Sequence, residues 1–193
     1  MAVQPNFQQA TREAADRRLL ERVVARDREA FRELYVAYHR RLARFLMRLT
    51  RRYDVAEEVI NDTLWVVWRK AGEFRGESRI STWIMGIAYR RALKTLQAGG
   101  MAAAEMVPVD SEVLAGADEI GAAEMSDWIV QAMAKLPAEQ RLALEFAYTF
   151  GHSCEEIAQI MDCPINTVKT RMFHAREKLR RILPALAGQG REP

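Results

Sequence analysis

The sequence predicts an all-α protein made of two small helical domains joined by a flexible acidic linker. Apolar residues recur at spacings of three and four on both sides of the chain's middle, which is the period of helices with one buried face. The middle itself is rich in glycine, alanine and acidic residues, a composition that does not bury a core. We therefore expect helical domains at residues 15–97 and 127–185, a linker at 98–126, and disordered tails at 1–14 and 186–193.

The distribution of charge supports this division. Residues 1–97 hold 20 basic and 12 acidic side chains, a balance of +8, whereas residues 98–127 hold seven acidic and no basic ones, or −7. Residues 128–193 add nine basic and seven acidic side chains, or +2, so that the whole chain reaches only +3. Two basic domains suit a nucleic-acid partner. Taken alone, the acidic segment could equally be a solvated spacer.

Composition excludes several classes of protein. No run of about 18 uncharged apolar residues occurs, so no membrane insertion is expected. The first 13 residues lack the apolar core of a signal peptide, which favours a cytoplasmic protein. The two cysteines, Cys154 and Cys163, are too few for a disulfide framework or a four-thiolate zinc site.

The first domain is expected to begin with two helices. A short helix carries Leu19, Leu20, Val23 and Val24 and closes near Arg26. The next helix has arginines on its surface and one apolar stripe, which predicts a single buried face. The stripe comprises Phe31, Leu34, Tyr35, Tyr38, Leu42, Phe45, Leu46 and Leu49.

A third helix is expected to start at Asp54. Asp54 and Glu57 have the spacing of a capping box, in which each side chain satisfies backbone N–H groups at the helix start. Steps of about 100° per residue place one polar group of side chains opposite the buried face. This group comprises Glu58, Asn61, Asp62 and Trp65. A tryptophan among carboxylates indicates an interface anchor, and the alternative is that a neighbouring helix covers it.

The helical period breaks at residues 74–78, where we expect a loop containing Arg75, Gly76, Glu77 and Ser78. Ser81 or Thr82 then caps a helix from Trp83 to Leu96. Cations that follow phosphates and rings that stack on unpaired bases suit a single nucleic-acid strand. The predicted helix brings together one aromatic and three basic side chains, Tyr89, Arg90, Arg91 and Lys94. Any amphipathic surface helix can show a similar pattern.

The second domain has the pattern of a DNA-binding helix-turn-helix. A helix over 138–150 stops at Gly151, and Ser153 with Glu156 forms a second capping box before a short apolar helix. A tight turn over 162–164 then leads into a long basic helix that Asn166 is expected to cap.

The long final helix separates an apolar stripe from a DNA-reading surface. The stripe comprises Val168, Met172, Ala175, Leu179 and Ile182. Phe173 lies about 140° away from its centre. An exposed phenylalanine suits contact with thymine methyl groups or sugars, and the alternative is an oligomerisation helix. The proposed DNA-reading residues are Thr167, Lys169, Thr170, Arg171, Phe173, His174 and Lys178.

The sequence supports neither catalysis, nor a metal site, nor a cofactor. His152, Cys154 and Cys163 lack a fourth ligand at the spacing that zinc requires. His39 and His174 stand apart from any paired carboxylate, and no phosphate-binding glycine loop or nucleophile elbow occurs. We therefore expect a binding protein rather than an enzyme.

Over residues 17–97 and 127–183 the chain resembles a group 4 (extracytoplasmic function, ECF) sigma factor of bacterial RNA polymerase. Three groups of residues carry the resemblance: Tyr53 to Val59 with Trp68; Phe74 to Ser78 leading to Thr82, Trp83 and Ile84; and Glu155 to Ala158 through Asn166 to Arg171. The resemblance implies sigma domain 2 at residues 15–97 and sigma domain 4 at residues 127–185.

The resemblance also implies a role for each surface. The face with Trp65 would bind the β′ clamp helices of core polymerase, and domain 4 would meet the β flap. The loop with Gly76 would capture a flipped base of the −10 element, and the helix with Tyr89, Arg90 and Lys94 would contact the melted strand. The final helix would read the −35 element, and the acidic linker would mimic nucleic acid near the RNA exit path. An anti-sigma factor is an expected partner.

Our leading hypothesis is a sigma factor that recruits core polymerase to a small, stress-responsive promoter set and promotes melting. Arg90 and Lys94 depart from the family, which commonly has Asn and Asp there, so the −10 preference should not be copied from relatives. The alternatives are a stand-alone helix-turn-helix regulator with residues 1–97 as a sensor or dimerisation domain, and a zinc- or thiol-dependent enzyme.

Overall fold

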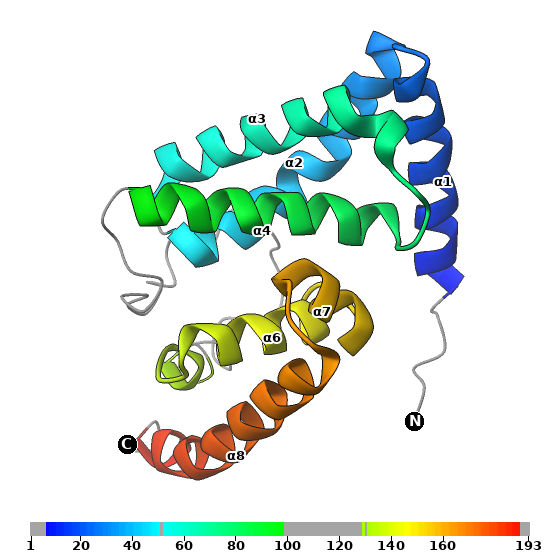
Figure 1. Cartoon of the computed structure of the whole chain (residues 1–193). Helices are drawn as coiled ribbons and strands as arrows, with labels where there is room; N and C mark the ends of the chain where they lie inside the picture. The colour runs from blue at the N-terminus through cyan, green and yellow to red at the C-terminus, as the bar shows by residue number, and fades with distance from the viewer. Residues whose placement is uncertain (1–6, 51, 99–128, 130, 190–193) are drawn as a thin grey trace.

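The structure, a computed structural model, describes residues 7–50, 52–98, 129 and 131–189 (Figure 1). All regular elements in these residues are helices, which confirms the predicted fold class. The N-terminal half contains α1 (Phe7–Val24), α2 (Arg28–Thr50), α3 (Tyr53–Lys70), the 3-10 turn η1 (Ala71–Glu73) and α4 (Ile80–Ala98). The C-terminal half contains a short helical segment at 129–134, of which residue 130 is not described, and then α6 (Ala138–Tyr148), α7 (Cys154–Met161) and α8 (Ile165–Gln189).

Helices α2, α3 and α4 pack together and α1 lies against one end of them (Figure 1). Asp27 caps α2, because its Oδ1 accepts hydrogen bonds from the backbone N–H groups of Glu29 and Ala30 at 2.9 and 3.1 Å. The apolar stripe predicted for α2 is largely buried, with Leu34, Leu42 and Phe45 at its centre. Among the described helices, none is long and apolar enough to cross a membrane.

Helix α1 starts earlier than the sequence analysis expected. The predicted tail ended at residue 14, whereas α1 begins at Phe7, so residues 7–14 belong to the folded part. Glu13 explains the difference, because its Oε1 accepts a hydrogen bond from the backbone N–H of Ile80 at 3.1 Å and ties α1 to the start of α4. At the other end, α8 continues to Gln189 and passes the predicted boundary at residue 185. Residues 1–6, 99–128 and 190–193, which include most of the predicted linker, lie outside the described residues.

Three predicted helix caps are corrected by the structure. Helix α4 begins at Ile80, so Ser81 and Thr82 lie inside its first turn and neither caps it. Helix α3 begins at Tyr53 without a side-chain cap, and Asp54 forms an ion pair with Arg52 instead of a capping box. Asn166 lies within the first turn of α8, which begins at Ile165, so it does not occupy the capping position. The capping box of Ser153 and Glu156 is confirmed, with both of its hydrogen bonds present at the start of α7.

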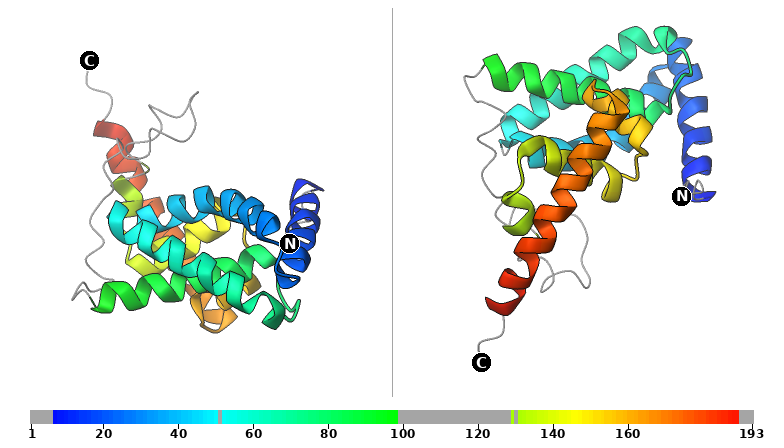
Figure 2. Two further views of the ribbon diagram at one scale, coloured as in Figure 1. Left: turned by 90° about the horizontal axis from the view of Figure 1, so that it is seen from above. Right: turned by 60° about the horizontal axis from the view of Figure 1, so that its bottom comes forward.

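Helices α7 and α8 form the predicted helix-turn-helix, and α6 packs against both. Asp162 ends α7 with a φ of 49°, in the left-handed region, and the chain turns through Cys163 and Pro164 into α8. Val168, Met172 and Ala175 bury the inner side of α8, as their spacing predicted. The far end of α8 extends away from the N-terminal half (Figure 2).

The two halves pack against each other and share one apolar core, which the prediction of two tethered domains did not anticipate. Helix α7 lies against α4, and both Figure 1 and Figure 2 show them side by side. Phe146 of α6 is fully buried, with its ring 5.1 Å from that of Phe45 on α2 and 6.4 Å from that of Tyr89 on α4. Aromatic rings at these distances stabilise the contact between the two halves in two ways: they bury a large apolar area, and their tilted or edge-on arrangement is electrostatically favourable.

Candidate functional site

The outer face of α3 is exposed, as its sequence predicted. Trp65 is 57% exposed, so the alternative that a neighbouring helix covers it is wrong. The polar residues around it, Glu58, Asn61 and Asp62, are exposed as well. Two of them are held in place by neighbouring helices: Asn61 accepts a hydrogen bond from the Tyr35 hydroxyl at 3.0 Å, and Asp62 pairs with Arg91 at 2.9 Å. The face is therefore a fixed acidic surface with one large aromatic side chain.

Glu57 lies on α3 beside the acidic face and contacts His39 of α2. His39 was expected to stand apart from any carboxylate, but its Nε2 lies 3.2 Å from Glu57 Oε2. The His39 ring also stacks on Tyr35 with centroids 5.6 Å apart. These contacts join α2 to α3 beside the acidic face, and the residues involved come from different helices, which is why the sequence alone did not pair them.

The loop between η1 and α4 presents its predicted residues to solvent. Arg75, Gly76 and Glu77 are exposed and Ser78 is half-buried. Gly76 has a φ of +74°, a backbone conformation that residues other than glycine rarely adopt. Phe74 anchors the loop, with its ring centroid 5.3 Å from that of Trp83 on α4. The result is an exposed loop with one backbone position that favours glycine.

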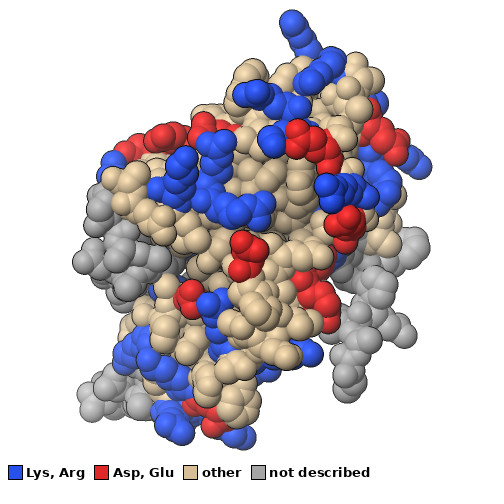
Figure 3. Space-filling view, in the orientation of Figure 1, with Lys and Arg blue, Asp and Glu red and all other residues tan. Residues whose placement is uncertain are grey.

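The basic side chains of α4 line a groove of about 480 Å³ between α3 and α4. Lysine and arginine side chains gather over this part of the molecule (Figure 3). Arg90 and Lys94 are exposed, as predicted. Lys70 and Trp83 also line the groove and were not in the predicted set, because they come from different parts of the chain. The groove offers cations beside an indole ring, which suits a single nucleic-acid strand.

Tyr89 does not belong to this groove, which corrects its assignment as a strand-contacting residue in this arrangement. Only 5% of Tyr89 is exposed, and its ring packs edge-on against Phe146. Burial raises the pKa of its hydroxyl group. The sequence could not reveal this position, because the residue that covers Tyr89 lies in the other half of the chain.

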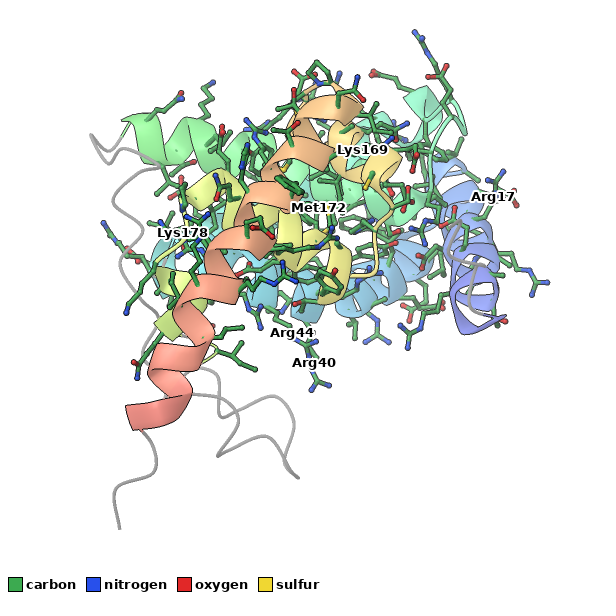
Figure 4. The ribbon with its side chains drawn as sticks, turned by 90° about the horizontal axis from the view of Figure 1, so that it is seen from below. Arg17, Arg40, Arg44, Lys169, Met172 and Lys178 are labelled. Atoms are coloured by element: carbon green, nitrogen blue, oxygen red, sulfur yellow. The ribbon has the colours of Figure 1, made fainter. Side chains whose placement is uncertain are left out.

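The outer side of α8 carries the predicted DNA-reading residues. Phe173 is 59% exposed, and Lys169, Thr170, His174 and Lys178 are exposed too. Figure 4 shows Lys169 and Lys178 on α8, on either side of Met172. Thr167 and Arg171 are half-buried, and Arg171 pairs with Glu139 of α6 and donates to Cys163 Sγ at 3.3 Å. Arg171 is therefore partly engaged within the domain.

A shallow hollow of about 310 Å³ lies beside this surface. It adds two residues that the sequence analysis missed, Gln140 of α6 and Asn166 of α8. Both side chains are amides, which donate and accept hydrogen bonds and read adenine well in a major groove. The sequence does not place Gln140 beside the DNA-reading residues, because that position depends on how α6 packs on α8.

Glu156 joins the C-terminal half to the N-terminal half. Its carboxylate pairs with Arg79 and accepts hydrogen bonds from the Thr82 hydroxyl at 2.8 Å and the Ser153 backbone at 2.9 Å. Burial alone would raise the pKa of Glu156, but the Arg79 guanidinium and the hydrogen bonds from Ser153 and Thr82 favour the charged form and hold the pKa well below its usual range. His152 Nδ1 lies 3.7 Å from Glu156 Oε2, too far for a hydrogen bond.

The described residues contain no group of three or more His, Cys, Asp and Glu side chains that could hold a metal ion. What the geometry offers is a set of binding surfaces: an acidic face with Trp65, a basic groove on α4, and a basic helix in a helix-turn-helix.

Comparisons with known proteins identify the class of protein to which the chain belongs. The chain matches the family models "Sigma-70 region 2" over residues 34–100 and "Sigma-70, region 4" over residues 126–179. It is 30% identical to an ECF RNA polymerase sigma-E factor of Haemophilus influenzae, over 85% of this chain and 93% of that protein. It is also 30% identical to an RNA polymerase sigma-H factor of Pseudomonas aeruginosa, over 89% and 95% of the two chains.

Solved structures give the same fold. The sigma factor RpoE of Bartonella quintana, in a co-crystal structure with the anti-sigma factor NepR, is 25% identical with a TM-score of 0.59, covering 80% of this chain and 96% of that one. CnrH, in complex with the cytosolic domain of CnrY, has a TM-score of 0.65 at 20% identity, covering 89% and 98%.

The two matched regions define a sigma-70-type transcription factor. The chain belongs to the sigma-70 family, and within it to the ECF sigma factors, as its resemblance to them predicted. Such factors bind RNA polymerase and start transcription at specific promoters, without catalysing a reaction of their own. A stand-alone helix-turn-helix regulator is set aside, because the N-terminal half matches region 2 rather than a sensor domain.

Proposed function

We propose that the acidic face of α3 binds the β′ clamp helices of core RNA polymerase, while domain 4 meets the β flap. The exposure of Trp65 among Glu58, Asn61 and Asp62 supports this role. A partly exposed tryptophan becomes a strong anchor when a partner buries it, and the carboxylates around it complement a basic partner.

Helix α8 then reads the −35 element in the major groove of duplex DNA. Support comes from the exposed ring of Phe173 on its outer side, beside Lys169, Thr170 and His174. A ring at this position meets thymine methyl groups, whereas lysine follows phosphates. The exposure of Phe173 is the observation that carries the proposed function, since a helix in water gains nothing from it.

The −10 element is captured as a melted strand by the N-terminal half. The loop with Gly76 receives one flipped base, and the groove lined by Trp83, Arg90 and Lys94 holds the strand beside it. Binding of unpaired bases favours the melted promoter, so melting is driven by binding energy alone.

Reading both elements requires the two halves to separate. The elements lie about 25 base pairs apart by their names, or roughly 85 Å at 3.4 Å per base pair. A folded chain of this length has a radius of gyration of about 16 Å. In the packed arrangement α7 also lies against α4, and Phe146 of α6 covers Tyr89. We therefore assign the packed form to the free factor and an extended form to the initiation complex.

The factor serves a specialised, stress-responsive promoter set and is held by an anti-sigma factor until it is needed. The B. quintana neighbour, whose structure holds the anti-sigma factor NepR, supports an anti-sigma partner for this chain.

Two experiments on the full chain test the proposal. Purified protein is first passed over immobilised core polymerase, and we expect retention as a stoichiometric complex. That complex is then used for transcription from a library of promoter fragments, and we expect a narrow set with common −35 and −10 sequences. A protein that bound duplex DNA alone and was not retained by core polymerase would contradict the proposal.

A further inference from the structure

A pocket of about 420 Å³ lies where α2 meets the C-terminal half. Its volume falls in the range of small-molecule sites. Most of its wall is apolar, with Met133 and Leu144 from the C-terminal half, but its lining also includes three arginines and one glutamate. These charged residues are Arg48 of α2, Arg141 and Glu145 of α6, and Arg176 of α8.

The charged groups at the inner end of the pocket are buried and incompletely paired. Arg141 is 5% and Glu145 7% exposed. The nearest ion pair is loose, with Arg48 Nη1 3.9 Å from Glu145 Oε1. Within the described part of the chain, Arg48 Nε, Arg141 Nη2 and Glu145 Oε2 have no hydrogen-bond partner. Each buried polar atom left without a partner is costly, so the polar groups of this pocket are poorly satisfied by the protein itself.

The balance of charge in the pocket indicates the sign of a ligand. Three guanidinium groups face a single carboxylate, which leaves an excess of positive charge. Arg176 is held at the rim, with its guanidinium carbon 5.8 Å from the centre of the Tyr148 ring. A carboxylate head would pair with the guanidinium groups of Arg48 and Arg141 that line the pocket, and an apolar body would cover Met133 and Leu144.

We propose that this pocket binds a small organic anion with an apolar body and a single carboxylate. The ligand touches both halves, because Arg48 belongs to α2 whereas Arg141 belongs to α6. Binding therefore holds the halves together and favours the packed form over the extended one. The pocket is separate from the acidic face of α3 and from the outer side of α8.

The test uses octanoate as the probe and the full-length protein labelled with ¹³C in its methionine methyl groups. We expect a saturable shift of the Met133 signal, assigned with the variant Met133→Leu, and no shift of the core residue Met85. Octanol has the same chain without the charge and should bind at least about tenfold more weakly. Equal affinity for octanol and octanoate would overturn the proposal.

Two variants give opposite results if the carboxylate pairs with the arginines. Arg48→Met removes a partner of the ligand and should weaken octanoate binding by roughly tenfold. Glu145→Gln removes the negative charge that competes with the ligand and should tighten binding several-fold. Arg32→Met is the matched control for Arg48→Met, because Arg32 lies on the same helix, α2, but outside the pocket. It should leave octanoate binding unchanged. Loss of binding in both pocket variants, or no change in either, would show that the site does not recognise the carboxylate.

Discussion

Arg79, just before α4, forms a two-point ion pair with Glu156 of α7, and this pair joins the two halves of the molecule. Glu156 also belongs to the capping box of α7, so one carboxylate both starts the helix-turn-helix and fixes it to the N-terminal half. The side chains are 25% and 13% exposed, which places the pair away from bulk water without burying it fully. It is therefore an interaction whose removal should open the packed form.

Replacing Arg79 should release the halves while leaving the helix-turn-helix folded. Arg79→Leu removes the interdomain pair but keeps the hydrogen bonds between Ser153 and Glu156. Loss of charge-assisted hydrogen bonds of this kind costs about 2–3 kcal/mol. We expect a larger radius of gyration in small-angle X-ray scattering. Arg52→Leu, which breaks the exposed pair with Asp54, is the control and should leave the radius unchanged.

His152 should make folding stability depend on pH in the neutral range. It is buried beside Phe146, and burial lowers its pKa from the ordinary 6.5. The unfolded chain therefore binds a proton that the folded protein does not, so stability is lost as the pH falls below the unfolded value. Between about pH 7.5 and pH 5.5 the loss reaches up to about 1.4 kcal/mol.

Urea unfolding of the wild type and of His152→Gln at these two pH values measures this effect. The difference in stability between the two proteins should shrink on acidification. A difference that stayed constant with pH would contradict the assignment to His152.

Trp65→Ala should weaken core polymerase binding without destabilising the protein. The side chain is 57% exposed, so its removal leaves the core intact, whereas an anchoring tryptophan contributes about 2 kcal/mol or more to an interface. Affinity for core enzyme should fall about 30-fold, as measured by fluorescence anisotropy of labelled protein. Unchanged affinity together with an unchanged melting temperature would remove Trp65 from the interface.

Phe173→Ala should have the reciprocal effect on α8. Core polymerase binding should persist, whereas affinity of the holoenzyme for duplex DNA with the −35 element should fall by about 1–2 kcal/mol, since alanine cannot cover the apolar surface of the bases as the ring does. Competition binding with a duplex that lacks the element provides the baseline. If Trp65→Ala and Phe173→Ala weakened the same binding steps, the assignment of the two surfaces to different partners would be wrong.

The local features of the fold were predictable because short-range rules determine them. The spacing of Val168, Met172 and Ala175 identified the buried side of α8, and Ser153 with Glu156 identified the start of α7. The capping box predicted at Asp54 failed because Arg52 pairs with that carboxylate and the helix starts one residue earlier. A motif of this kind is decided by competition among neighbours that its spacing does not describe.

Contacts between distant residues were not predictable from one sequence. Tyr89 has the helical position of an exposed aromatic residue, but Phe146 of the other half covers it. The helical spacing of Phe146 is equally consistent with a place in the core of its own half and with a contact to the other half. The exposed residues of α3 and most of those of α8 were predicted correctly, because exposure on one helix follows from that helix's own pattern. Thr167 and Arg171 are half-buried instead, and Arg171 pairs with Glu139 of another helix.

The groove on α4 provides a final prediction, because Arg90 and Lys94 add two positive charges to its lining. Both side chains are exposed on its lining, so replacing them should change strand binding without disturbing the core. The double variant Arg90→Asn with Lys94→Asp removes two positive charges that follow phosphates and adds one repulsive carboxylate. For a single strand, removing one cation that pairs with a phosphate should reduce the slope of log affinity against log salt by about 0.7.

The measurement is binding of the holoenzyme to a single-stranded oligonucleotide that carries the non-template −10 sequence, over a range of salt concentrations. We expect the slope to fall by about 1.4, which corresponds to two phosphates. Arg28→Asn with Arg32→Asp, at exposed positions on α2 outside the groove, is the matched control and should keep the wild-type slope. An unchanged slope in the α4 variant would mean that the strand follows another path, since exposed cations beside a bound phosphate backbone necessarily release counterions.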